Sequence, residues 1–495
     1  MLNNIELKAV SVEQASYSGA DSIVVMMCKE CMHALELLQL PEAVKDVIKA
    51  FVAKKDDIYS AGSIERMTML VDGKLQNILF VGCGEGKDCK PNNFRKAAGN
   101  VVRELHKLKS EKAALVAAIT LNPKRDYYLN AIAEGLFLGA YTFTEYKSKK
   151  DDAPICSINV LSAIQNADAV LQNAEIAAEA VSFSRDLANH PGNVINPLTM
   201  VTKATEVAKS LGLEIEVLDE KDMAAKGMNS LLAVGQGSEI PPRLITLKYN
   251  GAGDAPYVAY VGKGITFDSG GISIKPGDGM GEMKDDMSGS AAVLGAIKAI
   301  AGLKLKCNII AVLACAENMP SGKAQRPGDI VRAANGKTIE VVNTDAEGRM
   351  VLADAVWYAC EQGATKVIDI ATLTGAVIIA LGNETSGIVA NNDELVKQIM
   401  EAGKQSGENY WQLPSLPECK EAIKSDVADL LNSAGRAGGC ITGGLFVGEF
   451  VKEGTPWAHI DIGGTSTSEK TSGHKVNGCT AFGTMTLIKL AEALQ

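Results

Sequence analysis

The sequence predicts an α/β protein of two domains, with a smaller N-terminal α/β domain and a larger C-terminal α/β domain built on a mainly parallel central sheet. Residues 1–160 alternate short strand-like and helix-like stretches. Further along, nearly continuous apolar runs occupy residues 257–261, 308–314 and 366–371, and helix-like stretches separate them. Such runs are typical of strands in a parallel sheet whose two faces are both covered by helices.

The composition is that of an ordinary soluble globular protein, with 46% hydrophobic and 22% charged residues in a chain of 495. This length allows more than one domain and at least one large core. The formal net charge of −10 argues against non-specific binding to DNA or to an anionic membrane as the main task. A local basic patch is still compatible with this charge, but neither a membrane nor a nucleic acid is expected as the principal partner.

Eleven cysteines are present, an odd number, and several lie in apolar runs, such as Cys307 and Cys315. This distribution is typical of buried free thiols in a reducing cytosol. The first residues lack a basic segment followed by an apolar core, and no apolar run approaches the ~20 residues of a membrane span. These features predict a cytoplasmic protein. Cys28 and Cys31 form a C-x-x-C pair, a weak signal on its own, for which a structural role is favoured over redox or metal function.

Local patterns in the N-terminal domain predict strands and helices that alternate. In chain order they are a strand over 22–27, a hairpin over 68–71 and 77–81, a helix over 93–108, a strand over 113–119 and a helix over 128–139. Asp72-Gly73 is a good signal for the hairpin turn. Residues 82–87 are rich in glycine, but their spacing fits neither the Walker nor the dinucleotide pattern, so a tight turn is favoured over a phosphate loop. Residues 147–152 are expected to form an exposed turn.

An alanine-rich stretch over residues 166–187 carries apolar side chains near helical spacing, which predicts a long helix. Asn189 begins a loop of turn-forming residues. We therefore expect a connecting helical segment over 161–188, between the N-terminal domain and a second α/β domain over 189–495.

Two clusters of polar residues stand out in the second domain. Residues 343–349 read Asn-Thr-Asp-Ala-Glu-Gly-Arg and lie between a strand-like run over 339–342 and a helix-like run. A strand-to-helix turn is where an α/β sheet usually presents reactive groups. The other cluster covers residues 261–271 and continues into Lys275 and residues 283–287.

The clusters contain four well-spaced acids: Asp268, Asp286, Asp345 and Glu347. If their loops converge, like charges would raise each other's pKa, and two divalent cations would supply the missing positive charge. Hard oxygen donors suit Mg, Mn or Zn, and bridging carboxylates hold such pairs roughly 3.5–4 Å apart. Neither cluster contains a histidine, so a histidine-built zinc site is not expected, and His459 is more typical of a packed core residue.

Plainer interpretations compete for single residues. Asp345 alone is more typical of a cap for the helix that follows. Asp285 and Asp286 are adjacent and point differently, so only one of them is expected to be a ligand, and spacing does not choose between them. The metal hypothesis depends on the acids occurring together with three bases: Lys263, Lys275 and Arg349.

The motifs in these clusters resemble those of the cytosolic leucyl aminopeptidases, the M17 metallopeptidase family. They read Val-Gly-Lys-Gly-Ile-Thr-Phe-Asp-Ser-Gly-Gly, Met-Lys-x-Asp-Met and Asn-Thr-Asp-Ala-Glu-Gly-Arg. The resemblance is most specific over residues 257–375 and extends more loosely from about Arg185 to the C-terminus. Residues 1–160 match only in size and α/β character. The resemblance implies a metal-dependent aminopeptidase, a hydrolase that removes the N-terminal residue from peptides.

The resemblance also implies two divalent ions, zinc or manganese, in the C-terminal catalytic domain. The tighter site would use Lys263, Asp268, Asp286 and Glu347. The more exchangeable site would use Asp268, Asp345 and Glu347, with the Asp345 carbonyl as a further ligand. Asp286 rather than Asp285 is then the expected ligand. Because the family forms hexamers, a homohexamer is implied, with a role in assembly for the N-terminal domain.

By the same resemblance, Lys275 and Arg349 would be the catalytic residues. A hydroxide bridging the metals would attack the first peptide carbonyl while Lys275 stabilises the oxyanion. Arg349 stays protonated and would hold an anion, such as bicarbonate, that shuttles the proton. The pocket for the first substrate side chain, with Leu, Met and other apolar groups preferred, would be lined by Met283, Thr372, Leu373 and Gly375, with Cys479 as a further candidate. Lys275 would also bind the substrate.

Two other functions compete with this one. A hexamer could act as a binding scaffold, and some relatives bind DNA, but the net charge and the complete catalytic set disfavour that as the main role. A different dimetal hydrolase, such as a phosphoesterase, is disfavoured by Lys263 as a ligand and by the scarcity of histidine.

Overall fold

The computed structural model describes residues 3–54, 57–149 and 154–494. The helix predicted over 166–187 is confirmed as α4, Ala167–Asn189. Within the described ranges, none of the helices is both long and apolar enough to cross a membrane.

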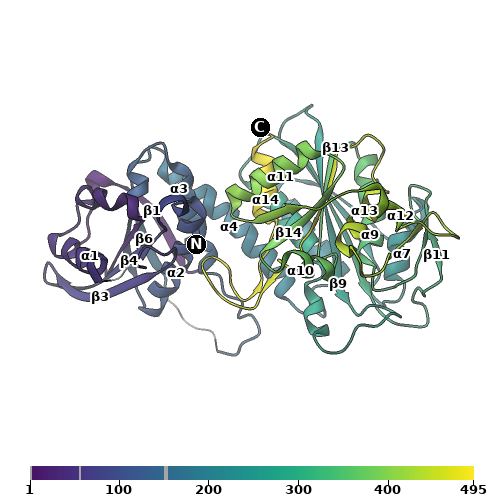
Figure 1. The fold of residues 1–495 in the computed structure, drawn as a ribbon, viewed down its shortest axis with the longest axis horizontal. Coiled ribbons are helices and arrows are strands. Elements are labelled where there is room, and N and C mark those ends of the chain that lie inside the picture. The colour runs from purple at the N-terminus through teal and green to yellow at the C-terminus, as the bar shows by residue number, and fades with distance from the viewer. Residues whose placement is uncertain (1–2, 55–56, 150–153, 495) are drawn as a thin grey trace. The chain divides into compact units, whose positions relative to one another are not determined.

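The chain divides into two compact units (Figure 1). The N-terminal unit comprises Met1–Ser182 together with Glu469–Asn477. The C-terminal unit comprises Phe183–Ser468 and Gly478–Gln495. Each unit contains its own sheet and its own hydrophobic core.

The N-terminal unit is built on a six-stranded sheet in the order β1-β6-β5-β2-β4-β3. Its strands are β1 Ile5–Ser11, β2 Ser22–Met27, β3 Ile64–Val71, β4 Lys74–Gly82, β5 Lys112–Ala117 and β6 Cys156–Ser162. All neighbours are parallel except β3 and β4, which form the predicted antiparallel hairpin. The φ angles of 50° at Asp72 and 79° at Gly73 are those of a type I′ turn.

Helices connect these strands. They are α1 Glu42–Lys54, α2 Pro91–Lys107 and α3 Asp126–Gly139, with the 3-10 helices η1 Val12–Gln14, η2 Lys29–Leu38, η3 Gly86–Asp88 and η4 Ala118–Leu121. The helices predicted over 93–108 and 128–139 are confirmed as α2 and α3, whereas the strand predicted over 113–119 ends earlier, where η4 begins. Residues 147–149 are exposed, as the predicted turn requires, and residues 150–153 lie outside the described ranges.

The glycine-rich turn after β4 is irregular, with positive φ angles of 104° at Gly84 and 56° at Gly86.

A segment near the C-terminus of the chain also belongs to the N-terminal unit. In the segment Glu469–Asn477, Gly473 N donates a hydrogen bond to Asn100 Oδ1 at 2.9 Å. Gly99 of α2 lies so close to Gly473 that an added Cβ atom would meet the Gly473 carbonyl oxygen at 2.3 Å.

The C-terminal unit is built on an eight-stranded sheet in the order β15-β14-β17-β13-β9-β10-β8-β7. Its strands are β7 Glu214–Leu218, β8 Arg243–Asn250, β9 Tyr257–Asp268, β10 Asn308–Asn318, β13 Ala364–Ala371, β14 Thr385–Ala390, β15 Asn409–Gln412 and β17 Trp457–Asp461. The central strands β17, β13, β9 and β10 are parallel, while β14, β8 and β7 pair antiparallel toward the edges. The predicted sheet is therefore confirmed as mixed and mostly parallel.

The remaining elements surround this sheet. The helices are η5 Met280–Asp285, α5 Pro197–Leu211, α6 Glu220–Ala225, α7 Asn229–Gly235, α8 Ser288–Gly302, α9 Gly348–Glu361, α10 Gly375–Leu381, α11 Asp393–Ser406, α12 Pro417–Glu421, α13 Gly439–Gly448 and α14 Thr484–Glu492. Two small sheets contain the short strands β11 Ile330–Arg332, β12 Thr338–Glu340, β16 Leu430–Leu431, β18 Thr467–Ser468 and β19 Gly478–Cys479. The strand expected over 339–342 is thus shorter, and it lies outside the main sheet.

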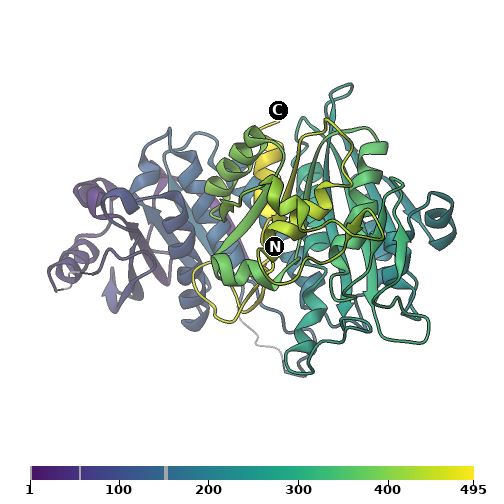
Figure 2. The same ribbon diagram turned by 45° about the vertical axis from the view of Figure 1, so that its right-hand side comes forward.

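Helices cover both faces of the large sheet (Figure 1 and Figure 2). Two adjacent residues of β9 show which helix covers each face. Gly262 faces Ser290 of α8 on one side, and the Lys263 side chain lies against Gly348 of α9 on the other. Every residue of β10 is buried. Burial on both faces explains why the central strands appear in the sequence as continuous apolar runs.

Helix α8 approaches the sheet so closely that two glycines leave no room for a Cβ atom. An added Cβ at Gly262 would lie 2.5 Å from Ser290 Cα, and one at Gly289 would lie 2.2 Å from Ile370 O. Only glycine allows backbones to come this near. The start of α8 is therefore held directly against β9, which leads into one polar cluster, and against β13, which leads into the predicted pocket residues Thr372 and Leu373.

The Gly289→Ala substitution is expected to lower the unfolding temperature of the C-terminal unit. Alanine stabilises a helix over glycine by about 1 kcal/mol, so a net loss would come from the clash with Ile370, and overpacking typically costs about 1–3 kcal/mol. Gly277→Ala is the matched control, because Gly277 is exposed and its Cβ would meet open space. Differential scanning calorimetry of both variants measures the effect, and a Gly289→Ala protein that melts higher than the parent contradicts the packing argument.

Candidate metal centre

Strand β9 supplies two of the predicted metal ligands, Lys263 near its middle and Asp268 at its end. On a regular strand, side chains separated by an odd number of residues point to opposite faces. A register shift with β10 leaves Thr266 without a partner between them. Such a β-bulge adds one residue and brings Lys263 and Asp268 to the same side of the strand.

The other predicted acids lie at helix starts. Asp286 lies between η5 and α8. Glu347 occupies the N-cap position of α9, and its side chain makes no capping hydrogen bond, so it is free to face the centre. The interpretation of Asp345 as the cap of this helix is wrong, because Glu347 holds that position.

Lys263 lies between two of the predicted acids. Its Nζ atom is 2.8 Å from Asp286 Oδ2 and 2.9 Å from Glu347 Oε1. It also donates a hydrogen bond to Thr372 O at 2.9 Å. The side chains of all three charged residues are less than one-tenth exposed.

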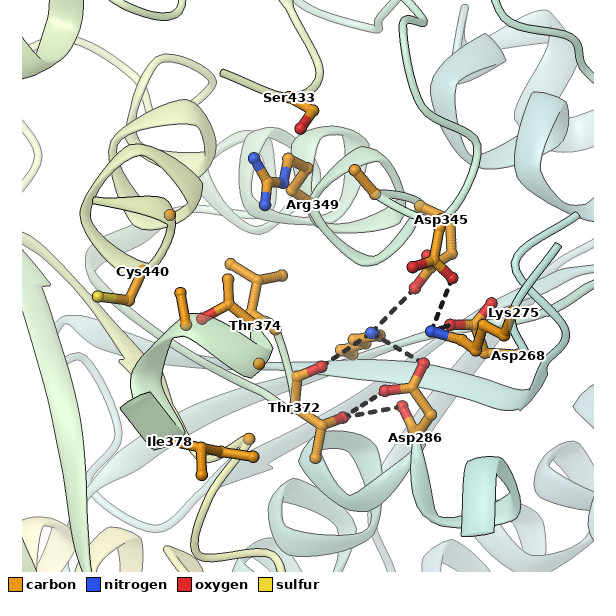
Figure 3. A pocket seen from close by; sticks show the side chains of 18 of the residues that line it. Asp268, Lys275, Asp286, Asp345, Arg349, Thr372, Thr374, Ile378, Ser433 and Cys440 are labelled. Carbon is orange, nitrogen blue, oxygen red and sulfur yellow. Dashed lines mark hydrogen bonds and ion pairs between the residues drawn. The ribbon is translucent and has the colours of Figure 1, made fainter. Parts of the chain in front are cut away.

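A second ion-paired group lies beside the first (Figure 3). Lys275 Nζ is 2.8 Å from Asp268 Oδ2 and 2.7 Å from Asp345 Oδ1. One carboxylate oxygen from each of three buried acids lies within 4.8 Å of the other two: Asp268, Asp286 and Glu347. The fold therefore brings the two sequence clusters to a single place.

Burial makes these carboxylates hard to ionise. It raises the pKa of Asp286 well above its usual value and, with the nearby charge of Asp268, raises the pKa of Glu347 to about 7. Burial also raises the pKa of Asp345. Each shift has the direction that desolvation and like charges produce, so the group needs positive charge to stay ionised near neutral pH.

The two lysines supply part of that charge. Burial alone would lower the pKa values of Lys263 and Lys275, but the surrounding carboxylates outweigh it and raise both. The ammonium groups are therefore protonated in this arrangement. A divalent cation would neutralise the same carboxylate oxygens more effectively than the two ammonium groups do.

Several carboxylate oxygens are left poorly satisfied, which fits a metal site. Among the described residues, Glu347 Oε2 is buried without a hydrogen-bond partner. Asp286 Oδ2 and Asp345 Oδ1 lack hydrogen bonds of good geometry as well, although ammonium nitrogens lie 2.8 and 2.7 Å away. Buried oxygens that lack donors are costly unless a cation binds them, and hard oxygen ligands suit divalent ions. The donor set therefore fits the metals that the motifs imply.

Neighbouring groups orient the carboxylates. Asn318 Nδ2, at the end of β10, donates to Asp268 Oδ1 at 2.8 Å, and Gly270 N donates to the same oxygen at 2.9 Å. Thr372 Oγ1 donates to Asp286 Oδ1 at 2.8 Å. Hydrogen bonds of this kind fix the orientation of metal ligands. The sequence did not predict Asn318, because its position depends on the pairing of β9 with β10.

Arg349 lies apart from the carboxylates, near Thr374 and Ser433 (Figure 3). Burial lowers its pKa to about 10, so the guanidinium is still protonated at neutral pH. Among the described residues, its Nε atom is buried without a hydrogen-bond partner. A buried, charged donor without an acceptor is suited to bind an anion.

A cavity of about 1040 Å³ opens onto this group of acids and lysines. It is lined by every predicted metal and catalytic residue and by the four predicted pocket residues Met283, Thr372, Leu373 and Gly375. Cys479 is instead buried, with its Sγ 3.9 Å from the Ser288 hydroxyl. His459 is fully buried, as predicted, and pairs with Asp369 at 2.5 Å.

Other lining residues were not predicted. Helix α10 contributes Ile378 and Ile379, and the segment before α13 contributes Ser433 and Arg436. Asp461, at the end of β17, accepts a hydrogen bond from Leu373 N at 3.1 Å. These residues lie in short stretches far from the acidic motifs. No local sequence pattern indicated that they would line the cavity.

Comparisons with known proteins identify the family of this chain. The Cytosol aminopeptidase family, catalytic domain, matches residues 182–488, and the Cytosol aminopeptidase family, N-terminal domain, matches residues 24–150. A "Probable cytosol aminopeptidase" of Alkaliphilus oremlandii (strain OhILAs) is 43% identical, and the match covers 99% of this chain and 98% of that protein. One from Alkaliphilus metalliredigens (strain QYMF) is 47% identical over 84% of this chain and 85% of that protein.

Solved structures show the same fold. A mutant of tomato leucine aminopeptidase superposes with a TM-score of 0.87 at 31% identity, covering 99% of this chain and 96% of that one. The bottromycin maturation enzyme BotP, solved in complex with Mn, superposes with a TM-score of 0.86 at 33% identity, covering 96% of this chain and 100% of that one. Both domains, the sheet architecture and the site motifs thus lead to one conclusion: this chain belongs to the cytosol aminopeptidase family, whose members are metal-dependent peptidases.

Proposed function

We propose that this chain is a two-metal aminopeptidase that releases apolar N-terminal residues, with Leu and Met preferred, from peptides. The observation that carries the proposal is the convergence of three buried acids in the wall of a large cavity, where one Glu347 oxygen has no hydrogen-bond partner among the described residues. The acidic group lies within residues 189–495, which we assign to catalysis.

The residues would share two ions. The tighter position would be held by Lys263, Asp268, Asp286 and Glu347, and the more exchangeable one by Asp268, Asp345 and Glu347. To act as a ligand, Lys263 must lose its proton, since only the neutral amine has a free electron pair. The Mn bound by BotP and the hard donor set support manganese or zinc.

When bound, two such ions lower the pKa of a water molecule between them and polarise the peptide carbonyl. Lys275 would then be released from Asp268 and Asp345, because the ions neutralise those carboxylates. Its side chain is about one-quarter exposed to the cavity, at 23%. Its ammonium would donate to the oxyanion that develops on the scissile carbonyl, where a fixed donor is most effective.

Arg349 would hold an anion rather than act as a base. Its guanidinium is protonated, and its buried Nε lacks a partner within the described structure. A bicarbonate held there could accept a proton and return it to the leaving amine. No aspartate or glutamate is required for that transfer, which leaves the four acids free to bind metal.

The cavity wall supports an apolar preference. Met283 and Leu373 lie on it together with Ile378 and Ile379 of α10. Methionine adapts to differently shaped apolar groups, which suits a pocket that accepts both Leu and Met. Asp461 orders the wall by binding the backbone of Leu373 and the hydroxyl of Thr374.

The cellular location and the oligomeric state are part of the same proposal. We propose a cytoplasmic protein, supported by the names of the relatives and by the free thiols of all eleven cysteines. We also propose a homohexamer in which the N-terminal unit contributes to assembly, since related enzymes are expected to share their quaternary arrangement.

A direct assay tests the proposed reaction. Protein stripped with a chelator should not cleave leucine p-nitroanilide, and addition of Mn²⁺ or Zn²⁺ should restore cleavage. p-Nitrophenyl phosphate is the control substrate and should not be hydrolysed under the same conditions. Full cleavage by the stripped protein, or a preference for the phosphate ester, would rule the proposal out.

Asp286→Ala is expected to remove one of the two bound ions, because it deletes a ligand of the tighter position alone. Asp285→Ala is the matched control at the adjacent residue and should keep both ions. Elemental analysis of the two purified variants gives the metal content per chain. Equal content in both variants would exclude Asp286 as a ligand.

Lys275→Ala is expected to lower kcat by roughly 10²–10³-fold, the usual effect of losing one oxyanion donor, while both metals stay bound. Steady-state kinetics with leucine p-nitroanilide and elemental analysis on the same sample separate these two effects. Lys323→Ala, at an exposed loop position, serves as the control. Near-normal turnover of Lys275→Ala would remove this residue from the mechanism.

A further inference from the structure

The N-terminal unit contains a second group of side chains of the types that bind metals, apart from the candidate metal centre. The C-x-x-C pair follows β2, with Cys28 as the N-cap residue of η2. Cys89 follows η3 in the loop after β4. Because β2 and β4 are parallel neighbours, these loops emerge at the same edge of the sheet.

The side chains converge closely. Cys28 Sγ lies 3.1 Å from Cys31 Sγ. One side-chain atom each of Cys28, Glu30 and Cys89 lies within 4.8 Å of the other two. In a tetrahedral site with Zn–S bonds of about 2.3 Å, sulfur atoms lie about 3.8 Å apart, so small side-chain rotations would suffice.

The two loops are also tied to each other. Glu30 Oε1 accepts a hydrogen bond from Gly86 N. Lys29 N donates to Gly84 O at 3.2 Å, and Lys29 Nζ pairs with Glu85 at 2.8 Å. The backbone at both glycines has positive φ, which shapes the loop that delivers Cys89. The donors are therefore held near one another by contacts other than the thiols themselves.

The thiols are reduced, and an ion can reach them. All three cysteines are free, Cys28 is buried, and Cys31 and Cys89 are partly exposed. A thiolate is the form of cysteine that binds metals.

We propose that Cys28, Cys31 and Cys89 form a binding site for a thiolate-preferring cation of the zinc class, with Glu30 as the fourth ligand. Three sulfurs and one carboxylate make the tetrahedral donor set that zinc takes in structural sites. Binding releases the thiol protons to solvent and involves no oxidation. The site would cross-link the loops after β2 and β4 in the N-terminal unit.

A disulfide between Cys28 and Cys31 is the competing chemistry, since a C-x-x-C pair at a helix start is also a redox motif. Two features favour the metal. A disulfide uses two sulfurs and leaves the third thiol, Cys89, without a role, although it converges on Cys28 together with Glu30. In a reducing cytosol, where we place the protein, vicinal thiols persist and bind metal.

Cobalt spectroscopy tests this site in the full-length protein, because the catalytic ligands include no sulfur. Reduced, metal-stripped protein titrated with Co²⁺ should develop near-ultraviolet sulfur-to-cobalt charge-transfer absorption whose final intensity corresponds to one thiolate-bound cobalt per chain. Cys28→Ser and Cys89→Ser should each weaken or abolish this absorption. Cys419→Ser, which removes a partly exposed thiol of the C-terminal unit, is the control and should retain it.

Two results would overturn the proposal. One is the absence of thiolate absorption in the reduced parent protein, a measurement that does not depend on whether any variant folds. The other is absorption that survives in both Cys28→Ser and Cys89→Ser. Thiol counting before and after reduction identifies the redox alternative, since a Cys28–Cys31 disulfide that forms readily, without a cobalt–thiolate band, points to a redox pair.

Discussion

The repulsion among buried carboxylates is the constraint on which the C-terminal unit depends. Asp268, Asp286 and Glu347 are nearly inaccessible to water, and their oxygens lie within 4.8 Å of one another. Such a group is tolerated only beside positive charge, and removing one member of a buried charge cluster leaves the others uncompensated. Lys263 fulfils this requirement within the protein. The same side chain is thus both counter-ion and expected ligand.

Much of the fold and of the site could be predicted because their signals are local. Continuous apolar runs predicted the central strands β9, β10 and β13, and Asp72-Gly73 predicted the hairpin turn. The acids next to glycines predicted the oxygen-rich centre, and the predicted site residues line one cavity, except for the further candidate Cys479. A side-chain type, its neighbours and a short spacing are enough for such predictions.

The rest depends on contacts between distant parts of the chain. The bulge at Thr266, which turns Asp268 toward Lys263, exists only because β9 pairs with β10. Asn318 and Asp461 become relevant only once their strands lie beside β9 and β13. The C-x-x-C pair was weak evidence for the same reason, since Cys89 joins it through the pairing of β2 with β4. Likewise, no sequence pattern distinguished β7, β8 and β14, the strands that pair antiparallel toward the edges of the large sheet.

The return of the segment Glu469–Asn477 to the N-terminal unit has a consequence for biosynthesis. A ribosome delivers this segment among the last residues of the chain, so Gly99 and Asn100 of α2 meet Gly473 only when translation is almost finished. Domains usually fold as units during synthesis, N-terminal ones first. Here the first unit to emerge stays incomplete until the second has been made, and a fragment cut after α4 would contain its six strands but not its last piece.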